Sequence, residues 1–280
     1  MVLAAVITPI LVVALVVAVF LLLPPGYTVG VGVAIALGIA VSLHERRRNE
    51  GGQVLQPQEA PELFAAVDRV CVIADLARPE IVIEHERQPN SWIVAPPGRP
   101  PRLHVTAALL ELLEPDELTA VIAHELSHLA NRDALVMTVV GTPGVILLRG
   151  GFGSNGTRWL FNVGVMLAGM IGLLSRVGTN ALSRCRELTA DASAATLTGH
   201  PSTLAAALMK VSGAIEQVPR ADLRAVAARD SFHLVAAERF TATWFGDSPL
   251  VRRLFATHPP IERRLRALEE LEHRLHHPAH

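Results

Sequence analysis

The chain has 280 residues, a formal net charge of −1 and a pI of about 6.9. This length suits one large domain or two modest ones, and the near-zero charge excludes the basic surface that nucleic-acid binding requires. Hydrophobic residues make up 50% of the sequence and the mean hydropathy is +0.37, which is too apolar for an ordinary soluble protein. The two cysteines are too few for a disulfide scaffold.

Two apolar runs open the chain. Residues 2–23 are continuously apolar and long enough to cross a bilayer as one helix, and a shorter glycine-rich run covers residues 28–43. A cleaved signal peptide is the alternative, but the first run lacks a basic start and a clear cleavage site. The runs therefore predict a transmembrane hairpin at 1–48. The arginine cluster at 46–48 predicts a multi-pass plasma-membrane protein whose catalytic domain faces the cytoplasm.

A polar stretch, residues 49–60, predicts a linker to a main domain at 61–280. This domain opens with a predicted helix from Pro61 whose apolar residues share one face. Those residues are Leu63, Val67, Val70, Cys71 and Ala74. Three short strands are then predicted, at residues 81–83, 91–94 and 103–106.

A hydrophobic segment interrupts the second half of this domain at about residues 134–178. Its two apolar runs, 134–148 and 159–175, are short for spanning helices, so they predict either a second transmembrane hairpin or a pair resting on the membrane or the protein. The chain is predicted to be helical again after residue 180. The last predicted helix follows Pro260 and leads into a histidine-rich, solvated end.

The most informative stretch is His124-Glu125-Leu126-Ser127-His128, inside a predicted helix that starts at Pro115. Histidines at positions i and i+4 lie on one face of a helix, so both imidazoles can reach one zinc ion. The glutamate between them can take a proton from a water that the metal activates. Glu125 also projects into the apolar face of this helix, where a nearby dication would compensate its charge.

A second acidic motif follows at Glu187 and Asp191, which share one helical face. Glu187 is the expected third zinc ligand, which leaves the fourth position for water. Asp191 is expected to accept a hydrogen bond from a ligand imidazole. Two alternatives stand beside this interpretation: the two acids form a solvated face paired with local arginines, or Cys185 binds the metal.

Several of these segments carry a family resemblance that extends over nearly the whole chain. They are residues 118–128, 183–187 with Ala190 and Asp191, 197–201 and 257–265. In these motifs the sequence resembles the HtpX-like membrane zinc metalloproteases, relatives of the CAAX prenyl endopeptidases. The resemblance implies an α+β fold, with a mostly helical zincin-like metalloprotease core and a small β-sheet.

The same resemblance implies one Zn²⁺ per chain, bound by His124, His128 and Glu187, with Glu125 as the catalytic acid and base. It further implies that Asn90, Ser91 and Trp92 belong to a strand that binds the substrate backbone, although Ser91 stands where the family usually has alanine. His258 and Arg264 match a late segment whose side chains approach the active site, and either could stabilise an oxyanion. The alternative for His258 is a packing role at the start of a helix.

These observations predict a membrane-bound zinc endopeptidase that hydrolyses misfolded or membrane-associated proteins, a role in protein quality control. The expected partners are protein or peptide substrates and the lipid bilayer, with the oligomeric state left open. One alternative is a processing protease dedicated to one lipidated peptide or regulator. Another is a membrane scaffold that keeps the zinc site without turnover, against which the intact Glu125 argues.

Overall fold

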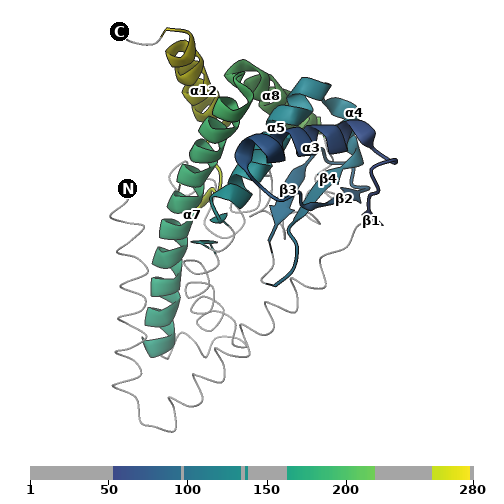
Figure 1. Cartoon of the computed structure of the whole chain (residues 1–280). Coiled ribbons are helices and arrows are strands. Elements are labelled where there is room, and N and C mark those ends of the chain that lie inside the picture. The colour runs from purple at the N-terminus through teal and green to yellow at the C-terminus, as the bar shows by residue number, and fades with distance from the viewer. Residues whose placement is uncertain (1–52, 96–97, 134–135, 138–162, 218–253, 278–280) are drawn as a thin grey trace. The chain divides into compact units, whose positions relative to one another are not determined.

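The computed structural model describes residues 53–95, 98–133, 136–137, 163–217 and 254–277, with only the backbone described for 163–171 (Figure 1). The chain divides into two compact units, residues 1–51 with 135–182 and residues 52–134 with 183–280. The predicted hairpin at 1–48 and most of the segment at 134–162 lie outside the described residues. Within the described ranges, no helix combines the length and apolarity needed to cross a membrane.

A four-stranded mixed sheet forms one layer of the second unit. Its strands are β1 (Gln53–Val54), β2 (Glu80–Glu84), β3 (Ser91–Val94) and β4 (Arg102–Thr106), in the order β1-β2-β4-β3. The pair β2–β4 is parallel, and the two outer pairs are antiparallel. The three strands expected from the sequence are present, while β1 adds two residues of the expected linker. Because β3 is the last strand in this order, it lies at one edge of the sheet.

Six helices accompany this sheet in the described part of the chain. They are α3 (Pro61–Ala74), α4 (Ala107–Leu112), α5 (Pro115–Ala130), α7 (Val163–Thr198), α8 (Pro201–Gln217) and α12 (Ile261–His276). The sequence predicted an apolar run at 159–175 and a separate acidic helix after residue 180. Instead, α7 is one helix that continues from the apolar run through both acidic residues. The expectation of a mostly helical α+β fold is confirmed for the described residues.

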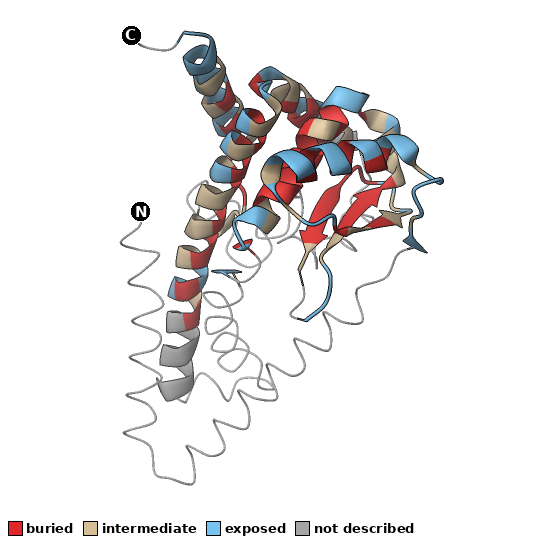
Figure 2. Cartoon of the chain, in the orientation of Figure 1, coloured by how far each residue is buried: buried red, intermediate tan, exposed pale blue. Residues whose placement is uncertain are grey.

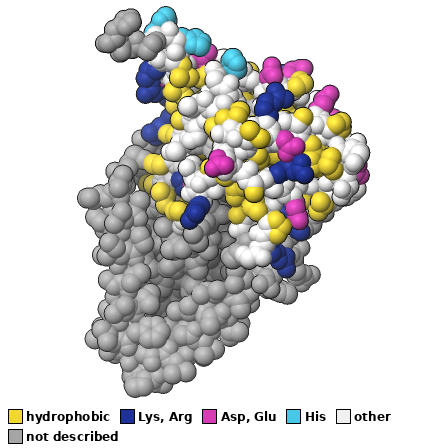
Figure 3. Space-filling view, viewed as in Figure 1, with side chains coloured by type: hydrophobic (Ala, Val, Ile, Leu, Met, Phe, Trp, Pro, Cys, Tyr) yellow, Lys and Arg dark blue, Asp and Glu magenta, His cyan; other side chains and the backbone are white. Residues whose placement is uncertain are grey.

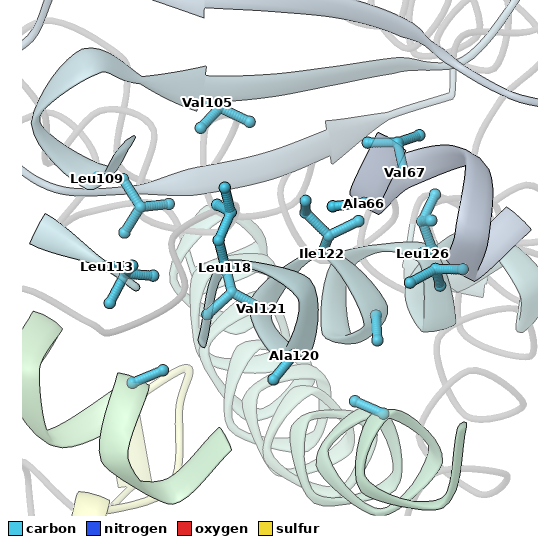
Figure 4. Close-up of a cluster of buried hydrophobic side chains, with 14 of the residues drawn as sticks. Ala66, Val67, Val105, Leu109, Leu113, Leu118, Ala120, Val121, Ile122 and Leu126 are labelled. Atoms are coloured by element: carbon cyan, nitrogen blue, oxygen red, sulfur yellow. The ribbon is translucent and has the colours of Figure 1, made fainter. Parts of the chain in front are cut away.

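The motif helix α5 contributes to the main hydrophobic core of the second unit. Buried side chains from α3, α4 and β4 lie in the same cluster as those of α5 (Figure 4). Val121, Ile122 and Leu126 of α5 are at most 1% exposed and pack with Val67 of α3 and Val105 of β4 in one apolar cluster. Figure 2 shows that the inward faces of the helices and most of β3 and β4 are buried, while β1 and the outer face of α3 are exposed. Burial of this kind is the main favourable term in folding, so it holds α5 firmly in place.

The start of α5 is fixed by local sequence. Pro115 occupies the first turn, where its missing N–H is not needed. The side chains of Glu114 and Glu117 each accept a hydrogen bond from the other's backbone N–H, which forms a capping box. Lys210 of α8 adds an ion pair of 2.7 Å to Glu117. These contacts set the register of α5 and hence the direction of its two histidines.

The far end of the described chain is polar. Charged and hydrophobic side chains are interspersed on the face shown in Figure 3, and histidines gather at the end of α12. His273, His276 and His277 are exposed, as the sequence predicted for this end. They lie apart from the buried histidines of α5.

Candidate metal centre

Two imidazoles of α5 converge on one point. His124 and His128 lie one helical turn apart, and their Nε2 atoms are 3.2 Å from each other. The His124 side chain is 1% exposed and that of His128 13%. The Nδ1 atom of each ring faces a carboxylate, which only accepts hydrogen bonds, so both Nδ1 atoms carry the proton. The Nε2 atoms of the two rings therefore face each other, an arrangement that a shared cation stabilises.

Glu187 of α7 completes the group. Its Oε1 lies 3.5 Å from His128 Nε2, and its Oε2 lies 3.7 Å from His124 Nε2. Among the described residues, these three offer a set of ligand atoms that all lie within 4.8 Å of one another. In a tetrahedral zinc site with bonds of about 2.05 Å, neighbouring ligand atoms are about 3.3 Å apart, so the observed spacing fits zinc. Cys185 is a free cysteine outside this group.

His124 is oriented by a buried ion pair. Its Nδ1 lies 2.9 Å from Asp191 Oδ1 on α7. Arg264 of α12 binds the same carboxylate with two hydrogen bonds, Nε to Oδ2 at 2.7 Å and Nη2 to Oδ1 at 2.6 Å. Burial raises the pKa of Asp191, but the Arg264 guanidinium and the His124 hydrogen bond outweigh it and lower that pKa to about 2. Asp191 is therefore ionised and holds the imidazole in one tautomer.

His128 has an equivalent partner that the sequence analysis missed. Its Nδ1 lies 2.7 Å from Asp133 Oδ2, just beyond the end of α5, and Arg186 Nη2 lies 2.9 Å from the same oxygen. Burial lowers the pKa of His128, but the Asp133 hydrogen bond and the Glu187 charge outweigh it and raise that pKa above its usual value. No periodic pattern marks Asp133 or Arg186, so only the arrangement of α5 and α7 reveals them.

Glu125 lies on the same helix, between the two histidines. It is 4% exposed, and its Oε1 accepts a hydrogen bond of 3.0 Å from the Ser91 hydroxyl of β3. Burial raises the pKa of Glu125 to about 8, against the lowering effects of His128 and Ser91. A carboxyl group with a pKa close to neutrality is suited to exchange protons. A bound dication beside it would favour the ionised form.

His258 belongs to the loop that precedes α12, and its ring contacts Glu187. Its Nδ1 is 3.1 Å from Glu187 Oε2, and its Nε2 is buried without a hydrogen-bond partner among the described residues. Burial raises the pKa of Glu187, but His258, His128 and His124 outweigh it and hold that pKa well below its usual value. Glu187 is therefore an ionised carboxylate. A buried ring nitrogen without a partner is uncommon and indicates a group that a ligand can satisfy.

The three residues expected to bind substrate do not share one face. Ser91 points to α5, whereas the Trp92 ring stacks on His104 at 4.9 Å, because successive residues of a strand alternate between the faces of a sheet. The backbone of Asn90 is bound to Thr106, with its N–H donating to the Thr106 hydroxyl at 2.9 Å. Ser91 is therefore the member of this set whose side chain reaches Glu125.

A helix with two converging histidines, an acidic residue from a second helix and a buried carboxyl group beside them is typical of metal-dependent peptidases. The model of peptidase family M48 matches residues 57–272 of the sequence. The chain therefore belongs to peptidase family M48 and, within it, to the HtpX-like proteases, as the resemblance implied.

Three relatives illustrate the similarity. The chain is 42% identical to "Protease HtpX homolog 1" of Streptomyces coelicolor, over 76% of this chain and 72% of that protein. It is 38% identical to "Protease HtpX homolog 2" of Methanosarcina acetivorans, over 79% of this chain and 76% of that protein. It is also 38% identical to "Protease HtpX homolog" of Moorella thermoacetica, over 86% of this chain and 82% of that protein.

Among solved structures, the crystal structure of S. mikatae Ste24p has a similar fold, with a TM-score of 0.55 at 16% identity. The match covers 92% of this chain and 62% of the Ste24p chain, so this protein spans less than two thirds of that relative's length. At this level of identity the likeness concerns the fold alone.

Proposed function

We propose that the protein is a zinc-dependent endopeptidase. The observation that carries this proposal is the convergence of His124 Nε2, His128 Nε2 and the Glu187 carboxylate, with ligand atoms within 4.8 Å of one another, beside the buried carboxyl group of Glu125. These three residues would hold one Zn²⁺ per chain. A site with three protein ligands keeps a position open, as catalytic zinc sites do.

In this proposal each nearby residue has a separate role. When bound, zinc supplies Lewis-acid chemistry, which acidifies water and polarises a carbonyl oxygen. Glu125 takes a proton from the attacking water and later delivers it to the leaving amine nitrogen. The Nε2 of His258 has no partner in the described part of the chain. With Nδ1 facing the Glu187 carboxylate, the protonated imidazolium form of His258 would donate a hydrogen bond from Nε2 to the negative charge that develops on the carbonyl oxygen.

Arg264 has a different role in this account. Two of its N–H groups bind Asp191 at 2.6 and 2.7 Å, so we assign it to holding the carboxylate that orients His124. Of the two residues expected to stabilise the oxyanion, His258 is therefore the better supported.

We propose that the substrate chain binds along β3. This strand is at the edge of the sheet, and an edge strand can accept an extended peptide as an additional strand. The hydrogen bond of 3.0 Å between Ser91 and Glu125 supports this, because it ties the edge to the residue that moves protons. Recognition through the backbone suits a protease with broad specificity.

We further propose that the enzyme is a multi-pass protein of the plasma membrane, with a hairpin at 1–48, a linker at 49–60 and a cytoplasmic catalytic domain at 61–280. The apolar runs at 2–23 and 28–43 and the arginines that follow support this layout. Misfolded or membrane-associated proteins are the proposed substrates, because a catalytic domain anchored at the bilayer meets them there.

The test of the proposed activity compares the full chain with Glu125→Gln, both purified in detergent and loaded with zinc. We expect one zinc per chain in both proteins, by elemental analysis, because Glu125 is not a ligand. We expect casein cleavage by the wild type to be lost on chelation and restored by zinc. Glu125→Gln should be slower by about 10²–10⁴-fold, the range for a proton-transfer group.

A matched control is Glu111→Gln, which removes an exposed carboxylate from α4. It should retain wild-type turnover. Wild-type activity in zinc-loaded Glu125→Gln, or casein cleavage that survives complete chelation, would overturn the proposal.

A further inference from the structure

The contact behind His128 involves two residues to which the sequence motifs assign no role. Asp133 follows the end of α5, where Arg132 adopts a left-handed conformation with φ of 53° that stops the helix. Just after this turn, Asp133 Oδ2 lies 2.7 Å from His128 Nδ1. A left-handed arginine is disfavoured, and this contact helps to hold it.

Arg186 completes the arrangement from another element. It comes from α7, 58 residues after His128, and its Nη2 lies 2.9 Å from Asp133 Oδ2 and 3.4 Å from His128 Nδ1. Since His128 Nδ1 carries a proton, both groups donate to the one carboxylate oxygen. The Asp133 side chain is 8% exposed and that of Arg186 is 18% exposed, so solvent competes little with this contact.

The same arrangement occurs twice around the proposed metal. His124 Nδ1 faces Asp191, which Arg264 binds, and His128 Nδ1 donates to Asp133, which Arg186 binds. A carboxylate behind a ligand imidazole fixes its tautomer and direction and makes the other nitrogen a stronger donor to metal. The arginine keeps that carboxylate ionised and in place.

We infer that Asp133 and Arg186 are positioning residues for the metal centre: together they hold the His128 imidazole with its Nε2 directed at the cation. This inference rests on the proposed zinc site and deepens it. Arg186 lies next to the proposed ligand Glu187 on α7, so the pair also ties the helix of one ligand to the helix of another. An ordinary surface ion pair would contribute to stability alone and would leave metal affinity unchanged.

The test measures zinc affinity by competition with a chelator on the full chain in detergent, with the melting temperature of the metal-free protein recorded beside it. Asp133→Asn should weaken zinc binding by about 10- to 100-fold, the effect typical of losing such a partner. Loaded with Co²⁺, it should also show an altered visible spectrum, because the ligand geometry changes. Glu111→Gln makes the same carboxylate-to-amide change on the exposed face of α4; it is the control and should bind zinc like the wild type.

Arg186→Gln provides a second test that leaves Asp133 in place. It should weaken zinc binding by up to about 10-fold, the low end of the effect of losing such a partner, because the Asp133 carboxylate stays in place. Arg186→Lys should recover part of this loss because the charge is retained. Wild-type zinc affinity in both Asp133→Asn and Arg186→Gln, with zinc bound normally by the parent chain, would overturn this inference alone. Failure of the wild type itself to bind zinc would instead overturn the proposed function.

Discussion

The buried pair between Arg264 and Asp191 gives the sharpest prediction about stability. Both side chains are 2% exposed, and two hydrogen bonds of 2.6 and 2.7 Å join them. We consider Arg264→Met, which keeps much of the side-chain volume but removes the charge and both donors. Asp191 would then be buried with only His124 as a partner.

The magnitude follows from the pKa of Asp191 and from the behaviour of buried ion pairs. A folded-state pKa of about 2 instead of 3.8 corresponds to about 2.5 kcal/mol of stability at neutral pH. Removing one partner of a buried pair typically costs about 3–5 kcal/mol, because the other charge is left uncompensated. We therefore expect Arg264→Met to lower the free energy of unfolding of the metal-free protein by about 3 kcal/mol.

The pH dependence of this loss has a definite sign. The folded-state pKa of Asp191 is below its unfolded value, so the contribution of the pair is complete above about pH 5 and is lost as the pH falls toward 2. The difference between wild type and Arg264→Met should therefore shrink on acidification. Urea unfolding of the metal-free chain at several pH values measures it.

The matched control is Arg263→Met, since Arg263 is the exposed neighbour on α12. It should change the free energy of unfolding by less than about 0.5 kcal/mol. If Arg264→Met unfolds at the same urea concentration as this control, the reasoning about the buried pair is refuted.

Three further predictions concern the core, the oxyanion and the metal. Leu126→Ala removes a fully buried side chain of α5 and should lower the free energy of unfolding by about 2–5 kcal/mol in urea titrations; a loss below 1 kcal/mol would contradict the packing described. His258→Ala should lower kcat for a peptide substrate by about 10²–10³-fold with little change in KM, and an unchanged kcat would remove His258 from the mechanism. Because the pKa of His128 is raised, protons should compete with zinc there, so the apparent zinc affinity should fall as the pH is lowered; a flat profile down to pH 5 would count against imidazole ligands.

The sequence predicted those features that local pattern controls. The helices α3 and α5 follow from their starting prolines and apolar faces, and β3 was predicted with its observed bounds. The i, i+4 spacing of His124 and His128 gave the direction of two imidazoles. These predictions needed only neighbours within a few turns of the chain.

Features that depend on distant parts of the chain could not be predicted in the same way. The parallel pairing of β2 with β4 and the recruitment of β1 from the linker depend on tertiary packing. The continuity of α7 was missed because its glycines and change of composition resemble a boundary. Asp133 and Arg186 were missed because their contact joins the loop after α5 to a distant position on α7 and follows no period.

In the proposed site, two imidazoles and one carboxylate hold a single zinc ion. X-ray absorption spectroscopy of the zinc-loaded full chain reports the atoms bound to that ion. We expect one zinc per chain with only nitrogen and oxygen neighbours at about 2.0–2.2 Å, and loss of this signal in Glu187→Ala. A sulfur neighbour at about 2.3 Å, which Cys185 could supply, or an unchanged spectrum in Glu187→Ala would contradict it.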